Sequence, residues 1–271
     1  MNAKQIKDIA VKMTQDEYFA ASEDRKVVTP ENVGGLVDYP ALFRAMQDDR
    51  ELRPALSESQ STGRAMNDFL SMDPAEFLGK YVIADGPVNP KTGKPYGADT
   101  KAFIEWKATQ SKIPVSSQAY NMFGKMAQAY NKHAFVKSLY GHERMRNVIL
   151  QADISGVPCL CKVDGLYFAD GSTFGIDVKT TSDLTTFARL APGLYYPEQQ
   201  ALIRLVMEAN GLESPQVRIV ALEKGPLPRC GVFAISRQDE VEVRVKSILS
   251  GYAEGLRTGV FSTRFEAPVL I

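Results

Sequence analysis

The sequence is poor in the residues that build most metal and disulfide sites. Its 271 residues include three cysteines, two histidines and one tryptophan. Three cysteines cannot all pair, and a structural zinc or an iron–sulfur cluster would usually need four ligands. Cys159 and Cys161 stand two residues apart in an apolar run, so we expect buried, reduced thiols rather than a metal site. His133 and His142 lack a second ligand four residues away, and we interpret both as structural or surface residues.

Net charge and long apolar runs are also missing. Lys plus Arg and Asp plus Glu each number 32, so the formal net charge is zero. This balance argues against a protein that coats nucleic acid by bulk electrostatics, although it allows a local basic channel. No apolar run approaches the roughly 20 residues of a membrane span, and the mixed-charge N-terminus has no signal-peptide core. We therefore expect a cytoplasmic protein that is not attached to a membrane.

The composition is that of an ordinary globular protein, with 44% hydrophobic and 24% charged residues. The hydrophobic periodicity changes near residue 140, from helical spacing to alternation. We therefore expect an N-terminal helical region over residues 1–140 packed on an α/β core over residues 141–271, within one compact domain. The predicted helices are 4–21, one starting near 29, 61–70, 102–110, 116–140, 194–210 and 238–256. The predicted strands are 147–154, 157–169, 173–180, 216–223 and 231–236, and 85–99 is predicted to be a loop.

One predicted β-hairpin carries the residues of chemical interest. The Asp170-Gly171 dipeptide fits a two-residue type I′ turn, which pairs Ala169 with Ser172. Counting back from that turn places Asp164 directly opposite Asp177. Side chains alternate along a strand, so the two carboxylates share one face of the sheet, with β-carbons about 4.5–5.5 Å apart.

The same register sets Lys162 opposite Lys179, on the face that carries Asp164 and Asp177. Two opposed carboxylates repel each other, as do two opposed lysines. A divalent cation between the aspartates would remove the conflict, because Mg²⁺ is usually held by one or two carboxylates, waters and phosphate oxygens. Metal-assisted phosphodiester hydrolysis needs a Lewis acid, an activated water and a nearby positive group, which Lys179 could supply.

A hydrophilic hairpin with an exposed Asp and Lys is the competing interpretation, since a lone Asp-x-Lys pattern is common. Ile176 and Val178 flank Asp177 and favour a buried central strand, in which unpaired carboxylates are costly.

These residues resemble the PD-(D/E)XK nucleases, and specifically the RecE-type (exonuclease VIII-like) exonucleases of phage and prophage recombination. The resemblance rests on Asp164, on Gly175–Thr181 (GIDVKTT) with Asp183, and on Tyr196–Gln199 (YPEQ) in a following helix. It extends to Ala221–Pro228 (ALEKGPLP) and covers about residues 145–258 well. It implies a restriction-endonuclease-like core, in which a central mixed β-sheet is flanked by helices.

The resemblance also implies roles for individual residues. Asp164 and Asp177 would bind Mg²⁺, for which Mn²⁺ can substitute, together with the backbone carbonyl of Val178. Lys179 would orient or activate the attacking water. Gln199, a further catalytic candidate, would lie over the site from the following helix and contact the scissile region or the lysine.

Two departures from the family pattern concern the acidic and basic groups of the site. Asn67 in Gly63–Asn67 stands where the family has a histidine, and Arg146-Asn147-Val148 stands where it tends to have a glutamate. An amide can offer an oxygen but cannot act as an acid or base near neutral pH. Further candidate contacts to the substrate are Tyr196, Lys162 and Asn67, although an aromatic residue at a helix start often packs into the core instead.

The function expected from the resemblance is a Mg²⁺-dependent deoxyribonuclease, most simply an exonuclease acting on linear duplex ends in phage-type homologous recombination. It would form a homo-oligomeric ring around DNA and work with a single-strand annealing protein in the bacterial cytoplasm. Two alternatives stay open: a catalytically weakened DNA-binding or assembly module of the same fold, and a structure-specific or sequence-specific endonuclease.

Overall fold

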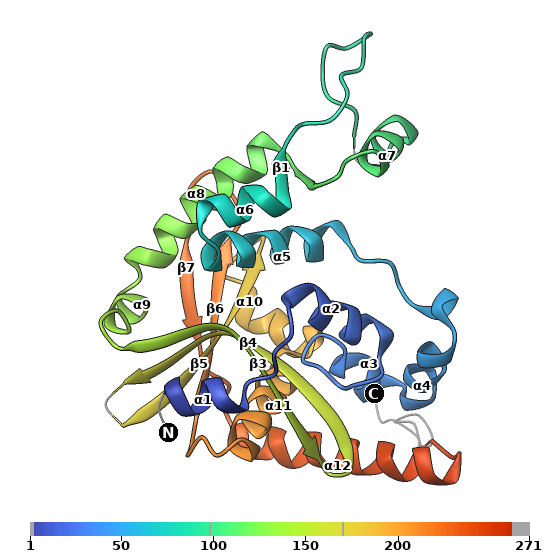
Figure 1. Cartoon of the computed structure of the whole chain (residues 1–271), viewed down its shortest axis with the longest axis vertical. Helices are drawn as coiled ribbons and strands as arrows, with labels where there is room; N and C mark the ends of the chain where they lie inside the picture. Colours follow the sequence, from blue (N-terminus) through green and yellow to red (C-terminus); the bar gives the residue numbers. More distant parts are fainter. Residues whose placement is uncertain (1–2, 98, 170, 262–271) are drawn as a thin grey trace.

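A five-stranded mixed β-sheet forms the centre of the protein (Figure 1). The structure is a computed structural model that describes residues 3–97, 99–169 and 171–261. The sheet order is β3-β4-β5-β6-β7, and all neighbours are antiparallel except the parallel pair β5 and β6. The strands are β3 (Glu143–Ile154), β4 (Val157–Ala169), β5 (Ser172–Thr181), β6 (Gln216–Glu223) and β7 (Cys230–Phe233). This arrangement confirms the expected α/β class with a central mixed sheet.

The hairpin between β4 and β5 adopts the predicted register. Five pairs run from Ala169 with Ser172 to Gly165 with Ile176. Gly171 has a φ of 75°, the left-handed conformation that a type I′ turn requires and that glycine adopts without strain. Asp170, the first residue of the predicted turn, lies outside the described residues. Turn chemistry and alternation therefore set the hairpin register correctly.

Helices cover both faces of this sheet (Figure 1). One face packs against α3, α11 and α12, and the other packs against α5 and α8. The longer helices are α2 (Gln15–Asp24), α4 (Pro40–Asp48), α5 (Glu58–Ser71), α7 (Lys101–Ala108), α8 (Ser117–Lys132), α11 (Tyr196–Ala209) and α12 (Gln238–Thr258). The shorter ones are α1 (Ala3–Ile9), α3 (Val33–Asp38), α6 (Pro74–Lys80), α9 (Ala134–Ser138) and α10 (Phe187–Leu190), with 3₁₀ turns η1 (Arg50–Leu52) and η2 (Ala191–Leu194).

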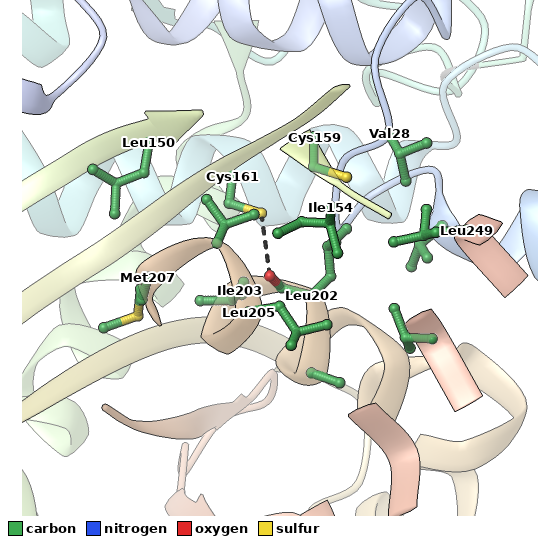
Figure 2. Packing of buried hydrophobic residues seen from close by; sticks show 14 of the residues in the cluster. Val28, Leu150, Ile154, Cys159, Cys161, Leu202, Ile203, Leu205, Met207 and Leu249 are labelled. Carbon is green, nitrogen blue, oxygen red and sulfur yellow. Dashed lines mark hydrogen bonds between the residues drawn. The ribbon is translucent and has the colours of Figure 1, made fainter. Parts of the chain in front are cut away.

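The core between the sheet and α11 contains two of the cysteines (Figure 2). Cys159 and Cys161 are fully buried among aliphatic side chains, and the Cys161 thiol donates to the Leu202 carbonyl at 3.8 Å. Cys230 is partly buried, and all three thiols are free. The expectation of reduced, unpaired cysteines agrees with this packing.

Two predicted helices are each divided in the structure. The helix predicted at 4–21 breaks between α1 and α2, because Thr14 and Glu17 form a reciprocal capping box that starts α2. The residue Val11 in the break donates its backbone N–H to the Ile149 carbonyl of β3. The helix predicted at 116–140 ends at Lys132, and His133 caps α9 by accepting the Phe135 N–H. His133 is therefore a structural residue, as expected.

A segment between two short parallel strands extends away from the sheet (Figure 1). The strands are β1 (Tyr81–Ile83) and β2 (Ile113–Val115), and neither was predicted from the sequence. The loop expected at 85–99 lies in this segment, ahead of α7. None of the helices in the described part of the chain combines the length and the apolar character needed to cross a bilayer.

Candidate active site

The aspartates lie where β4 and β5 stop pairing. The last backbone pair is Gly165 with Ile176, and one residue farther the Asp164 Oδ2 accepts the backbone N–H of Val178 at 2.8 Å. A side chain thus takes over a hydrogen bond that the neighbouring strand would otherwise supply. The N–H and C=O of one strand residue point to the same side, so the Val178 carbonyl also faces the β4 side, where pairing has ended.

Asp177 is held on β5 by a lysine and a glutamine. Lys179 Nζ lies 3.0 Å from Asp177 Oδ1, and Gln200 Nε2 donates to Asp177 Oδ2 at 2.5 Å. Asp177 is 7% exposed to solvent. Burial raises the pKa of the Asp177 carboxyl, the Lys179 charge lowers it, and the Asp164 charge raises it further. The influence of one carboxylate on the other supports their placement within one site.

Asp164 forms an ion pair with Lys162. Lys162 Nζ forms an ion pair with Asp164 Oδ1, and Asn67 Nδ2 lies 3.4 Å from Asp164 Oδ2. The predicted conflict between like charges is therefore already neutralised, because each aspartate pairs with the lysine two residues away on its own strand. A divalent cation is therefore not needed to relieve the repulsion between the two carboxylates.

The helix α11 brings three polar residues to the site. Tyr196 lies with its ring centroid 5.2 Å from Lys179 Nζ, in a cation–π contact. Gln199 does not contact either aspartate in the structure. Its Nε2 donates to the Leu194 carbonyl at 3.2 Å, while its Oε1 is buried without a hydrogen-bond partner. Gln199 was expected to contact the scissile region or the lysine, and its side-chain amide instead bonds to this backbone carbonyl. The glutamine that contacts an aspartate is its neighbour Gln200, for which no role was predicted.

Gln200 and Glu31 are site residues that the sequence interpretation missed. Gln200 is 1% exposed, and it belongs to a run of three buried polar residues, Glu198–Gln200, at the start of an otherwise apolar helix. This run of polar residues is visible in the sequence and could have identified Gln200 as a candidate site residue. Glu31 lies close enough for its charge to raise the pKa of both Asp177 and Lys179, and it accepts a hydrogen bond from the Tyr18 hydroxyl. Nothing in the local sequence pattern around Glu31 indicates this.

Burial and neighbouring charges shift the pKa of Lys179 in opposite directions. Burial lowers the pKa of its ammonium, but the negative charges of Asp177 and Glu31 outweigh that effect and the pKa is raised overall. The ammonium is thus strongly held as a cation beside Asp177. This places a positive charge within the site, where a phosphate oxygen would develop negative charge.

A cavity of about 170 Å³ opens beside Asp164, on the side of α5 and α8. Its lining includes Asn67, Asn147, Tyr167 and Arg146. The Oδ1 atoms of Asn67 and Asn147 are both buried without a hydrogen-bond partner. Buried polar atoms are normally satisfied, so these two acceptors indicate a place where a donor or a cation would be favourable.

Two arginines are held by acidic neighbours and so are not free to bind phosphate. Arg204 forms ion pairs with Glu208, Asp239 and Glu242, and Arg229 pairs with Glu223. These guanidinium groups stabilise local structure. Arg146 donates to the Leu70 and Ser71 carbonyls and still lines the cavity.

The site offers oxygen donors for the divalent metal that the sequence suggests. Within the described residues, no group of three or more His, Cys, Asp and Glu side chains is arranged to hold an ion. The oxygen donors present are the carboxylates of Asp164 and Asp177, the Val178 carbonyl and the unpartnered Asn67 Oδ1. Oxygen donors of this kind suit Mg²⁺, which is often bound by only one or two carboxylates with waters. The residues therefore fit the ion, with fewer acidic groups than the family pattern has.

Comparisons with known proteins identify a similar fold but do not establish an activity for this chain. No protein-family profile matches the chain, and no curated protein matches it. Among solved structures, it is similar to a protein from Eubacterium rectale that is provisionally described as an exonuclease. That match has a TM-score of 0.60 at 14% sequence identity and covers 92% of this chain and 88% of the other. A second structure, SSO0001, matches with a TM-score of 0.37 at 11% identity over 97% of this chain and 87% of that one, which is too weak to support an argument.

Proposed function

We propose that the chain hydrolyses phosphodiester bonds in DNA with a divalent metal held by Asp164 and Asp177. The observation that carries this proposal is the placement of the Asp164 carboxylate on the Val178 N–H, at the point where β4 and β5 separate beside Asp177 and Lys179. The similarity of fold to a protein provisionally described as an exonuclease supports it.

In this proposal each residue has a distinct role. Asp164, Asp177 and the Val178 carbonyl would hold Mg²⁺ or Mn²⁺, which when bound acts as a Lewis acid and makes water a stronger nucleophile. Lys179 would hold the attacking water or a phosphate oxygen, and Gln200 keeps Asp177 oriented. Tyr196 limits the positions open to the Lys179 ammonium.

The substrate that we infer is the end of a linear DNA duplex. The resemblance of the hairpin and α11 to RecE-type exonucleases supports this. The zero net charge is compatible with it, since a ring of subunits with a locally positive channel could enclose DNA without a strongly basic monomer. A homo-oligomeric ring, a single-strand annealing partner and a role in phage-type recombination in the bacterial cytoplasm belong to the same proposal. Light scattering of the purified protein tests the oligomer.

The test of activity compares wild type with Lys179→Ala on linear duplex DNA in Mg²⁺. The matched control is Lys80→Ala, because Lys80 is equally buried, with 20% against 19% side-chain exposure, and also pairs with aspartates. We expect release of nucleotides by wild type and the control, and at least a hundredfold loss in Lys179→Ala. Equal rates for wild type and Lys179→Ala would refute the proposal, and cleavage of closed circular DNA would indicate an endonuclease instead.

A second candidate function is a DNA-binding or assembly module that has lost efficient catalysis. Asn67 in place of the family histidine favours it, as does the absence of a third acidic ligand among the described residues. Calorimetry with Mn²⁺ distinguishes the two, because such a module need not bind metal. DNA binding without metal binding by wild type would support this second function.

A further inference from the structure

Lys162 is the most deeply buried ammonium group at the site. Its side chain is 3% exposed, against 19% for Lys179, and its ion-pair partner Asp164 is 11% exposed. An unpaired charge at such depth is strongly unfavourable, so the pair is held together by the surrounding protein. Lys162 lies on the same strand as Asp164 and outside the Asp-x-Lys pattern formed by Asp177 and Lys179.

Both oxygens of the Asp164 carboxylate already accept from donors. Its Oδ1 pairs with Lys162, and its Oδ2 accepts from the Val178 N–H and contacts the Asn67 amide. Asp177 likewise uses Oδ1 for Lys179 and Oδ2 for Gln200. The two aspartates and two lysines together carry no net charge.

Even with the negative charge that Glu31 adds nearby, a divalent cation in this arrangement would leave surplus positive charge in a poorly solvated site. Binding would then be weak unless an anion arrived with the cation, or the Lys162 ammonium withdrew from Asp164. The phosphate groups of DNA are anions of the required kind. While paired with Asp164, Lys162 Nζ also lies 5.7 Å from the centroid of the Phe19 ring, over which Arg64 lies at 3.9 Å.

We propose that Lys162 is a positioning residue that occupies Asp164 in the free protein and makes tight metal binding conditional on DNA. The inference rests on the proposed metal-dependent function. When a DNA phosphate enters, the Lys162 ammonium would move from the Asp164 oxygen toward that phosphate, and the freed carboxylate oxygen would be available to hold the ion. No bond is made or broken in this step. The consequence is that metal and DNA bind cooperatively, each strengthening the other by the same factor.

The experiment is calorimetric titration of Mn²⁺ into wild type and Lys162→Met, alone and with a short duplex whose terminal linkages are phosphorothioates that resist cleavage. For wild type, we expect Mn²⁺ to bind at least tenfold more tightly when the duplex is present. For Lys162→Met without DNA, we expect at least tenfold tighter binding than wild type, and little further gain on adding the duplex.

Two variants control for charge and folding. Lys162→Arg keeps the cation on Asp164 and should behave as wild type, and so should Lys80→Met, which removes a lysine that pairs with Asp16 and Asp68 instead. Should Lys162→Met fail to fold, Lys162→Gln provides the same comparison, because its amide can donate to Asp164 without a positive charge. Melting curves of each variant establish the folded state.

The outcomes separate this inference from the function on which it rests. Equal Mn²⁺ affinities for wild type and Lys162→Met, with binding clearly measurable, would overturn the role of Lys162 and leave the metal-dependent function standing. Absence of Mn²⁺ binding in both proteins, with and without the duplex, would overturn both. A DNA-dependent increase that persists unchanged in Lys162→Met would also exclude Lys162 as its source.

Discussion

The carboxylate of Asp164 accepts the backbone N–H of Val178 at 2.8 Å, one residue beyond the last pair that joins β4 to β5. This contact satisfies the Val178 N–H at the point where the strand pairing ends, and it holds the Asp164 carboxylate at the site. It also keeps the Val178 carbonyl on the side where a cation would bind.

The first prediction separates the structural role of Asp164 from its chemical role. Asp164→Ala and Asp164→Asn both leave Lys162 without a carboxylate, but the asparagine oxygen can still accept from Val178. We expect Asp164→Ala to be less stable than Asp164→Asn by about 1–3 kcal/mol in denaturant unfolding, because only alanine leaves that buried N–H unsatisfied. Both variants should lose nuclease activity. Equal stabilities would show that the Val178 hydrogen bond contributes little.

The second prediction concerns the two neighbouring glutamines of α11. Gln200 donates to Asp177, whereas Gln199 donates to a backbone carbonyl. We expect Gln200→Ala to lower the rate of DNA hydrolysis at least tenfold, since Asp177 loses the donor that orients it. Gln199→Ala, the matched control, should lower the rate less. The reverse order, measured under the same conditions, would favour the role that the family resemblance implies for Gln199.

The third prediction uses the unsatisfied oxygen of Asn67. This Oδ1 is buried without a partner, and the side chain contacts Asp164. Replacing the amide with a carboxylate, in Asn67→Asp, should raise the affinity for Mn²⁺ severalfold in calorimetry, because the site gains an anionic ligand. Asn131→Asp, at an exposed position lining the same cavity, is the control and should leave the affinity unchanged. Unchanged affinity in Asn67→Asp would place Asn67 outside the ion's ligands.

The fourth prediction follows from the buried thiols. Burial raises the pKa of Cys159 to about 12, raises that of Cys230 to about 11, and raises that of Cys161 well above its ordinary value. The folded state thus favours the protonated thiol. Its contribution to stability is complete below the unfolded-state pKa of about 8.5 and is lost as the pH rises from there toward the folded-state values.

We therefore expect the free energy of unfolding to fall between pH 9 and pH 11, and to fall less in Cys159→Ala. At pH 8, the native protein should react with iodoacetamide far more slowly than the denatured protein, because the thiolate is the reactive form. Rapid alkylation of all three cysteines in the native protein would contradict this burial.

Local chemistry accounts for the parts of the fold that could be predicted. The register of β4 and β5 follows from one turn dipeptide and the alternation of apolar residues, and the boundaries of β4 and β6 were predicted to the residue. The helix divisions at Thr14 and His133 were not foreseen. Each depends on a cap whose partner lies within a few residues, and such caps compete closely with continuation of the helix.

The sequence by itself determined the hairpin register, because the turn at Gly171 and the two-residue period of a strand set Gly165–Ala169 against Ser172–Ile176. It also identified Asp164, Asp177 and Lys179 as the candidate residues. Tertiary structure alone decided their surroundings. Gln200 rather than Gln199 reaches Asp177, Asn67 contacts Asp164, and Glu31 adds its charge from the N-terminal region. The physical reason is that strand alternation depends on neighbouring residues, whereas these contacts join residues far apart in the sequence and depend on distances that only the packed chain defines.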